Sequence, residues 1–94
     1  MARYDQLTDL ANRALFMDSL KKSIKRADRN DKKVGVVYMD LNGFKPVNDT
    51  LGHAAGDQLL KSFADRLQQV VRESDLPARL GGDEFTILAD NVND

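Results

Sequence analysis

Three carboxylates occupy positions from which they could bind a divalent cation. Asp40 comes directly after the apolar run at residues 34–39, and Asp83 and Glu84 follow a pair of glycines. A carboxylate at the end of a buried strand, next to acids on a neighbouring hairpin turn, can share a hard cation such as Mg²⁺. The pattern therefore favours a magnesium site formed by a strand end and a turn.

The segment after Asp40 has the features of a phosphate-binding loop. Residues 41–45 (LNGFK) stand between a predicted strand and a predicted short helix. Backbone N–H groups at a helix N-terminus can hold phosphate oxygens, and Lys45 adds a positive charge. Together with the carboxylates, this segment predicts a site for Mg²⁺ and a nucleotide.

Simpler interpretations of these residues stay open. Acids beside two glycines are typical of a solvated turn, and Asp40 can cap the helical turn that follows it. His53 is the only histidine, and it fits a turn or a cap better than a zinc site, which needs several ligands. An EF-hand loop that starts at Asp40 is excluded, because Lys45 stands where that loop needs glycine.

The composition is that of one small globular domain. Of 94 residues, 41% are hydrophobic and 31% are charged, and 14 basic against 15 acidic residues give a net charge of −1. This balance argues against a general nucleic-acid or membrane-surface binder, which has a basic excess. The chain has no cysteine, which excludes disulfides and thiolate metal sites. We expect a cytoplasmic domain with no nucleic-acid partner.

Apolar spacing predicts the elements that position these residues. Asn12 is a candidate N-cap for a helix that ends in the polar run at residues 28–31. A strand is expected over residues 34–40, and its β-branched residues on both faces predict a position deep in a sheet, covered on both sides. A short helical turn begins near Gly43 and Pro46 and ends at Gly52.

The second half of the chain predicts one more long helix and a hairpin. The helix is expected over residues 54–73, and Pro77 prevents its continuation. A hairpin follows over residues 78–89, because Gly81 and Gly82 permit the positive φ of a tight turn. The polar residues 90–94 are expected to form a loop. Two apolar stripes at helical spacing should face the core: Phe16, Leu20, Ile24 and Ala27, and Leu60, Phe63, Leu67 and Val70.

Three motifs in this order resemble the GGDEF family of diguanylate cyclases. Residues 81–85 (GGDEF) are the signature that names the family, and residues 5–13 (DQLTDLANR) resemble its opening pattern. Residues 40–57 (DLNGFKPVNDTLGHAAGD) match its central pattern at every position but one. The exception is Asn42, where the family usually has a second aspartate.

The resemblance implies an α+β fold similar to the palm of polymerases, with a central antiparallel sheet flanked by helices. It implies a single GGDEF domain over residues 1–94, with the C-terminal part of the family domain missing after the hairpin. The implied activity condenses two GTP molecules into cyclic di-GMP and releases two pyrophosphates, with Mg²⁺ or Mn²⁺, in a head-to-head homodimer. In the full protein, the family usually attaches this domain to a sensor domain for signal transduction.

The resemblance also implies roles for the acidic residues. Asp40 and Asp83 would bind Mg²⁺ through their carboxylates, and Leu41 through its backbone carbonyl. Glu84 would be the general base for the ribose 3′-hydroxyl, or a second metal ligand. Lys45 would help to neutralise charge in the transition state.

Other residues would bind the substrate or the product. Phe44 and Lys45 would meet the triphosphate, and Asn48 and Asp57 would recognise the guanine edge. Arg72 and Asp75 form an R-x-x-D pattern, and five residues separate it from the two glycines, which is the spacing of the family's product-inhibition site. A charged helix C-terminus, where arginine is favourable, is the alternative interpretation of that pattern.

Two other functions are considered beside the enzyme. One is a non-catalytic signalling module that binds GTP or cyclic di-GMP, and the other is an inactive fragment. The intact Asp83 and Glu84 favour the enzyme. Missing strands would leave an exposed sheet edge, which invites pairing with another chain.

Overall fold

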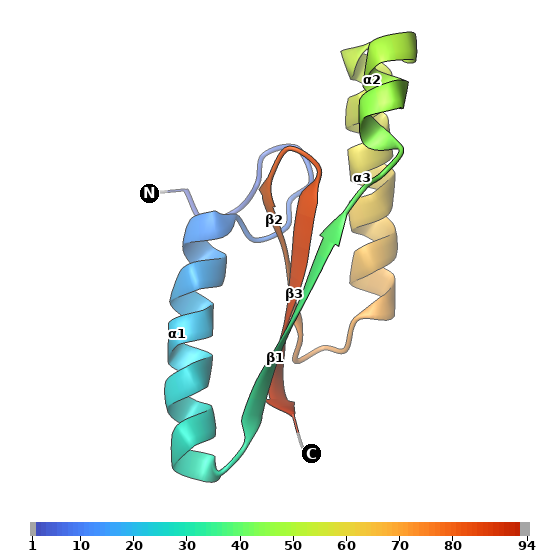
Figure 1. The fold of residues 1–94 in the computed structure, drawn as a ribbon. Helices are drawn as coiled ribbons and strands as arrows, with labels where there is room; N and C mark the ends of the chain where they lie inside the picture. Colours follow the sequence, from blue (N-terminus) through green and yellow to red (C-terminus); the bar gives the residue numbers. More distant parts are fainter. Residues whose placement is uncertain (1, 93–94) are drawn as a thin grey trace.

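A computed structural model describes residues 2–92, which form three helices and one three-stranded antiparallel sheet (Figure 1). This arrangement confirms the α+β fold. The elements follow in the order α1 (Arg13–Asn30), β1 (Lys33–Asp40), α2 (Phe44–Leu51), α3 (His53–Val70), β2 (Leu76–Gly81) and β3 (Glu84–Val92).

The central strand of the sheet is β3, because the strand order is β1-β3-β2. Its residues Phe85, Thr86 and Leu88 are at most 3% exposed. The register places Asp40 at the end of β1 opposite Glu84 at the start of β3. The hairpin turn between β2 and β3 therefore lies beside the end of β1.

Helices cover both faces of the sheet, with α1 on one side and α3 on the other (Figure 1). Successive residues of a strand point to opposite faces. Phe85 accordingly packs with Leu60 of α3, whereas Leu88 packs with Phe16 of α1. The Phe85 ring also meets Phe63 edge to face, with ring centroids 4.8 Å apart.

The prediction that β1 lies deep in the sheet was wrong for the described part of the chain. β1 is an edge strand, and Val36, Val37 and Tyr38 are 50–55% exposed. The β-branched residues on both faces correctly indicated a strand. They did not indicate its neighbours, because β propensity reflects a fit to a pleated surface and not the number of paired strands.

The helix ends agree closely with the predicted signals. The Asn12 side chain accepts a hydrogen bond from the Leu15 N–H at 2.9 Å, which confirms the N-cap of α1. α3 ends at Val70, three residues earlier than expected. The two predicted apolar stripes were less accurate, because Ile24 and Val70 are exposed and Ser23 is buried.

Within the described residues, no helix combines the length and apolarity that crossing a bilayer requires.

The end of the chain differs from the expected loop. β3 continues to Val92, so residues 90–92 belong to a strand. The rest of that expected loop, residues 93–94, lies outside the described residues.

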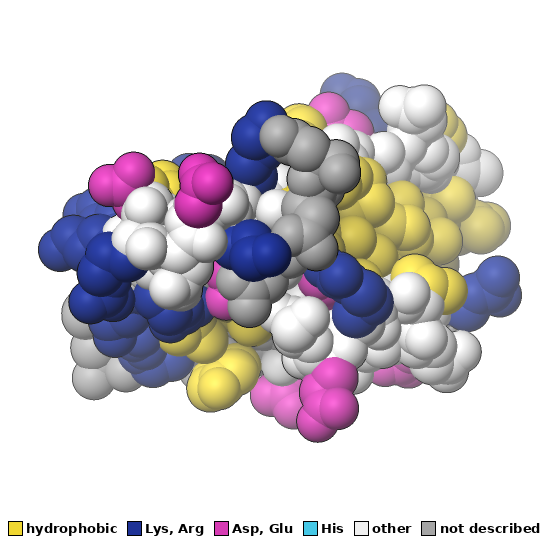
Figure 2. All heavy atoms as spheres, turned by 90° about the horizontal axis from the view of Figure 1, so that it is seen from below, with side chains coloured by type: hydrophobic (Ala, Val, Ile, Leu, Met, Phe, Trp, Pro, Cys, Tyr) yellow, Lys and Arg dark blue, Asp and Glu magenta, His cyan; other side chains and the backbone are white. Residues whose placement is uncertain are grey.

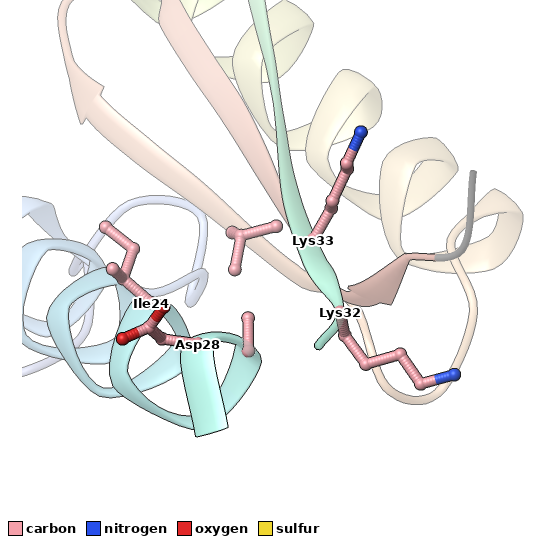
Figure 3. A pocket seen from close by; sticks show the side chains of 6 residues that line it. Ile24, Asp28, Lys32 and Lys33 are labelled. Carbon is pink, nitrogen blue, oxygen red and sulfur yellow. The ribbon is translucent and has the colours of Figure 1, made fainter. Parts of the chain in front are cut away.

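Two hollows lie in the surface. One lies where α1 ends and β1 begins (Figure 3), and it is lined by Ile24, Ala27, Asp28, Lys32, Lys33 and Val34. The other is apolar and is lined by Met39, Phe63, Arg66, Leu67 and Val70. Figure 2 shows apolar side chains gathered on the side of the molecule where α3 lies. Neither hollow is lined by a residue to which the sequence assigned chemistry.

Candidate functional site

The hairpin turn is built on two glycines with left-handed backbone. Gly81 has a φ of 152° and Gly82 a φ of 50°, values that side-chain-bearing residues rarely adopt. Apart from the adjacent residues in the chain, no atom lies within 4 Å of where a Cβ would stand at either position. Backbone conformation, and not crowding, therefore accounts for both glycines, and the turn delivers Asp83 and Glu84 to the end of β1.

Four residues whose oxygen atoms could bind a metal ion meet at the end of β1: Asp40, Leu41, Asp83 and Glu84. Asp40 and Glu84 are directly opposite each other on neighbouring strands. The Leu41 N–H donates to the carbonyl oxygen of Asp83 at 3.3 Å, which continues the pairing into the turn. Like charges in a directly opposed pair are destabilising. The fold thus concentrates negative charge at one end of the sheet.

The Glu84 carboxylate has a different neighbour at each oxygen. The Tyr38 hydroxyl donates to Oε1 at 2.5 Å, and Arg13 Nη2 lies 4.0 Å from Oε2. The hydrogen bond to Glu84, with burial and the charges of Asp40, Glu84 and Asp83, raises the pKa of Tyr38 to about 12. The Tyr38 hydroxyl therefore stays protonated and serves as a donor to the acidic group.

A second network fixes the turn from the other side. Arg79 donates from Nε to the Gly82 carbonyl oxygen at 2.9 Å, and from Nη1 to both carboxylate oxygens of Asp5 at 3.1 Å. Asp5 also accepts from the backbone N–H and the hydroxyl of Thr8, at 2.9 and 2.8 Å. The N-terminal loop is thereby tied to the turn that carries Asp83.

Asp5 is held in its ionised form by these contacts. Burial is the largest single influence and favours the neutral acid. The hydrogen bonds from Thr8 and Arg79, with the charge of Arg79, together outweigh it and hold the pKa of Asp5 below 3.8. The side chains of Arg79 and Asp5 are only 14% and 21% exposed, so solvent screens this pair weakly.

The donor set at the strand end fits a hard divalent cation. No three His, Cys, Asp or Glu side chains of residues 2–92 form a ready-made metal cluster. Mg²⁺ does not require one, since it usually takes one or two protein carboxylates and keeps waters and substrate phosphates. The Leu41 carbonyl accepts from the Phe44 N–H at 3.2 Å, and a carbonyl oxygen has a second lone pair.

The substrate residues that the resemblance implies lie mainly on α2 and at the start of α3. Phe44 is half-buried against the core, while Lys45 is exposed in the first turn of α2. The Asn48 side chain lies against Gly56 of α3, where a Cβ would collide with it. Asp57 is exposed beside that contact. The α2–α3 contact therefore brings Asn48 and Asp57 near each other.

Comparison with known proteins decides the family. Residues 2–94 match the family described as "Diguanylate cyclase, GGDEF domain". The chain belongs to the GGDEF family. It is 47% identical over 87 residues to the diguanylate cyclase TpbB of Pseudomonas aeruginosa, and 46% identical over 94 residues to the cyclic di-GMP phosphodiesterase NbdA of the same species. These matches cover 93% and 100% of this chain but only 20% and 12% of the relatives.

Solved GGDEF structures share the fold. A structure of TpbB that comprises only the GGDEF domain superposes with a TM-score of 0.92 at 44% identity, over 97% of this chain and 53% of that one. The GGDEF domain of DgcB from Caulobacter crescentus, solved with cyclic di-GMP, gives a TM-score of 0.92 at 33% identity over 99% and 54%. The GGDEF chain described here thus spans about half of each solved domain.

Arg72 and Asp75 lie at the opposite end of β2 from the GGDEF turn. The Asp75 carboxylate accepts from the Arg72 backbone N–H at 2.9 Å and from its Nη2 at 3.0 Å. The hydrogen bond from the Arg72 side chain is the main cause that lowers the pKa of Asp75. The strand between Leu76 and Gly81 separates this pair from the turn by about 17 Å at ~3.3 Å per residue.

Three residues at the GGDEF turn were not anticipated from the sequence. Tyr38 could have been found, because it stands two residues before Asp40 and so shares its face of the strand. Arg79 interacts with Asp5, 74 positions away, and Arg13 approaches Glu84 from the start of α1. No local pattern indicates contacts at such separations.

Proposed function

We propose that this GGDEF chain condenses two GTP molecules into cyclic di-GMP with release of two pyrophosphates. The observation that carries the proposal is the meeting of Asp40, Asp83 and Glu84 at one end of the sheet. Such a concentration of carboxylates suits a divalent cation that bridges to substrate phosphates. Relatives named diguanylate cyclases, among them TpbB and DgcS of Shewanella oneidensis, support the assignment.

The acidic residues would divide the chemistry between them. Asp40, Asp83 and the Leu41 carbonyl would hold Mg²⁺ or Mn²⁺, which when bound neutralises charge on the reacting phosphate. Glu84 would accept the proton of the ribose 3′-hydroxyl of one GTP as its oxygen attacks the α-phosphorus of the other. Pyrophosphate then leaves, and the second ester bond forms in the same way.

The remaining residues would bind and orient GTP. Phe44 and Lys45 would meet the triphosphate, and Asn48 and Asp57 would recognise the guanine. Catalysis of phosphoryl transfer rests mainly on positioning and on neutralising charge. Because the reaction joins two nucleotides and each chain would hold one, it needs a head-to-head homodimer.

Mass-spectrometric detection of cyclic di-GMP after incubation with GTP and Mg²⁺ tests the proposal. We expect product from the unaltered chain and none from Glu84→Gln, with similar folding of both. Glu73→Gln is the matched control, because Glu73 is exposed and is the only other glutamate. Product from Glu84→Gln would remove Glu84 from the role of base, and no product from the unaltered chain would contradict the cyclase activity.

A binding module for cyclic di-GMP is the second candidate, and the Arg72–Asp75 pair favours it. The exposed Arg72 guanidinium is oriented by Asp75, and guanidinium groups bind phosphate and the guanine Hoogsteen edge in pairs of hydrogen bonds. The relative NbdA is named a phosphodiesterase. The same pair would serve as a product-inhibition site in an active cyclase.

Calorimetric titration with cyclic di-GMP tests this second site. We expect Arg72→Ala to weaken binding by about tenfold or more, since a charge-assisted pair of hydrogen bonds is lost. Arg29→Ala, at the exposed end of α1, is the control and should leave the affinity unchanged. If Arg72→Ala binds cyclic di-GMP as tightly as the unaltered chain, Arg72 and Asp75 do not bind the ligand. Their role is then structural, as an ion pair that closes the turn before β2.

A further inference from the structure

The Tyr38 hydroxyl is directed into the candidate site. Tyr38 and Asp40 share one face of β1, because they are two residues apart, and Glu84 is directly opposite Asp40. Tyr38 and Glu84 are therefore diagonal neighbours, a separation that an aromatic side chain can bridge. The hydroxyl donates to Glu84 Oε1 at 2.5 Å.

Packing does not explain this tyrosine. The residue is 55% exposed, and it belongs to neither of the two core clusters. The buried residue across from it is Thr86, whose hydroxyl donates to the Val37 carbonyl and not to Tyr38. The specific contact of Tyr38 is the hydrogen bond to the Glu84 carboxylate.

That hydrogen bond counters a repulsion at the same place. Asp40 and Glu84 are like charges in a directly opposed pair, which favours movement of the Glu84 side chain away from Asp40. The Tyr38 donor on Oε1 holds the carboxylate in place, and Oε2 is directed toward Arg13. The hydrogen bond from Tyr38 is the close contact of the two, because the Arg13 pair is exposed and 4.0 Å long.

We propose that Tyr38 is a positioning residue that holds the Glu84 carboxylate beside Asp40 and Asp83. The inference rests on the proposed function, in which Glu84 takes the proton of the 3′-hydroxyl. Tyr38 acts through Glu84. A carboxylate oxygen keeps a second lone pair when it accepts one hydrogen bond, so Glu84 held by Tyr38 at Oε1 can still accept the substrate proton.

Carbon-13 labelling of glutamate Cδ tests the contact without any need for activity. The chain has only two glutamates, Glu73 and Glu84, so two carboxyl signals result, and Glu84→Gln assigns them. Tyr38→Phe removes only the hydroxyl, and we expect it to shift the Glu84 signal and leave that of Glu73. Tyr4→Phe, at the other exposed tyrosine, should move neither. An unmoved Glu84 signal in Tyr38→Phe overturns the proposal.

Steady-state kinetics test the consequence. Tyr38→Phe should lower kcat for cyclic di-GMP formation about tenfold, as expected for the loss of a hydrogen bond to a charged group. The KM for GTP should stay within about twofold, because the hydroxyl acts on Glu84 and not on the nucleotide. An unchanged kcat, or a loss confined to KM, contradicts the positioning role. If the unaltered chain forms no product, the cyclase proposal fails, and the carboxyl signal alone decides whether Tyr38 holds Glu84.

Discussion

Single side chains from distant parts of the sequence hold the GGDEF turn in place. Arg79 joins the Gly82 carbonyl to Asp5, and Tyr38 holds Glu84 from the neighbouring strand. Arg79 neutralises Asp5, whereas Tyr38 donates to one of the three acids at the strand end and so opposes the repulsion there. The geometry of the acidic group consequently depends on residues that would not touch a nucleotide.

The Asp5–Arg79 pair should make the stability of the domain depend on pH. Since the pKa of Asp5 is below 3.8 in the folded chain, its contribution is fully present above about pH 4 and is lost as pH falls through the folded pKa. We expect Asp5→Asn to lower the free energy of unfolding by about 1–2 kcal/mol at pH 7. Urea unfolding from pH 7 to pH 3 should show this difference shrink at the acidic end.

A neighbouring substitution separates the ion pair from general effects of charge. Asp9 lies in the same loop, is exposed, and has a φ of 63° that asparagine tolerates. Asp9→Asn should therefore leave the free energy of unfolding within about 0.5 kcal/mol of the unaltered chain. A deficit of Asp5→Asn that persists undiminished at pH 3 would contradict the role given to its ionised form.

Part of the candidate site could be predicted at the level of residues. The position of Asp40 at the end of a strand and of Asp83 and Glu84 after two glycines was sufficient to expect that they meet. The spacing of Tyr38 and Asp40 shows that they share a face, but the Tyr38–Glu84 contact depends on the register of β1 and β3. The Arg79–Asp5 contact was not predictable at all, because it joins residues 74 positions apart. Sequence spacing gives the face of a strand but not what lies across from it.

Among the elements, α2 and α3 approach each other closely at Gly56. The buried Gly56 lies against the Asn48 side chain and the Phe44 ring, with no room for a Cβ. This contact sets the position of α2 relative to α3. The residues proposed to bind GTP on these two helices are thus positioned by a glycine that has no chemistry of its own.

Gly56→Ala should destabilise the domain although alanine is the better helix former. The propensity gain is at most about 1 kcal/mol, whereas overpacking of a tight contact costs typically about 1–3 kcal/mol. We expect a net loss of about 1 kcal/mol in the free energy of unfolding. Gly35→Ala is the control, because a Cβ there would make only ordinary contacts of 3.6 and 3.7 Å. Equal stability of the two variants in urea unfolding would show that α2 adjusts freely.

The type and order of the elements were largely predictable, and their neighbours were not. The Asn12 cap, the glycines around α2 and the glycine turn are local signals, and each element formed close to where they indicated. The edge position of β1 was not predicted, because a β-branched pattern indicates a strand but not whether one or two strands pair with it. The exposed Val70 was missed because helix periodicity does not show where the core ends.

As a whole molecule, the described chain is open and thin. Its extents are 49 × 31 × 18 Å and its radius of gyration is 14.6 Å, against about 12 Å for a typical domain of this length. Two small cores, one on each face of the sheet, take the place of a single large one. The open shape leaves the outer edge of β1 without a partner strand within residues 2–92.

The outer edge of β1 has a defined pattern of free backbone groups. The Leu41 N–H bonds to Asp83, in register with the β1–β3 pair. Because bonded and outward positions alternate along an antiparallel strand, Val36 and Tyr38 direct their N–H and carbonyl groups away from β3. Such an edge pairs readily with another strand, and a net charge of −1 provides little repulsion between copies.

We therefore expect the 94-residue chain to self-associate through β1 even without nucleotide. Sedimentation velocity over a concentration series should show species larger than the monomer. Val36→Lys should shift them toward the monomer, because a lysine on an exposed edge strand opposes strand pairing. Leu51→Lys introduces the same charge at a residue that is 69% exposed at the end of α2, away from the edge, and should leave the association unchanged. If both variants shift the association equally toward the monomer, the added charge and not the edge of β1 governs it.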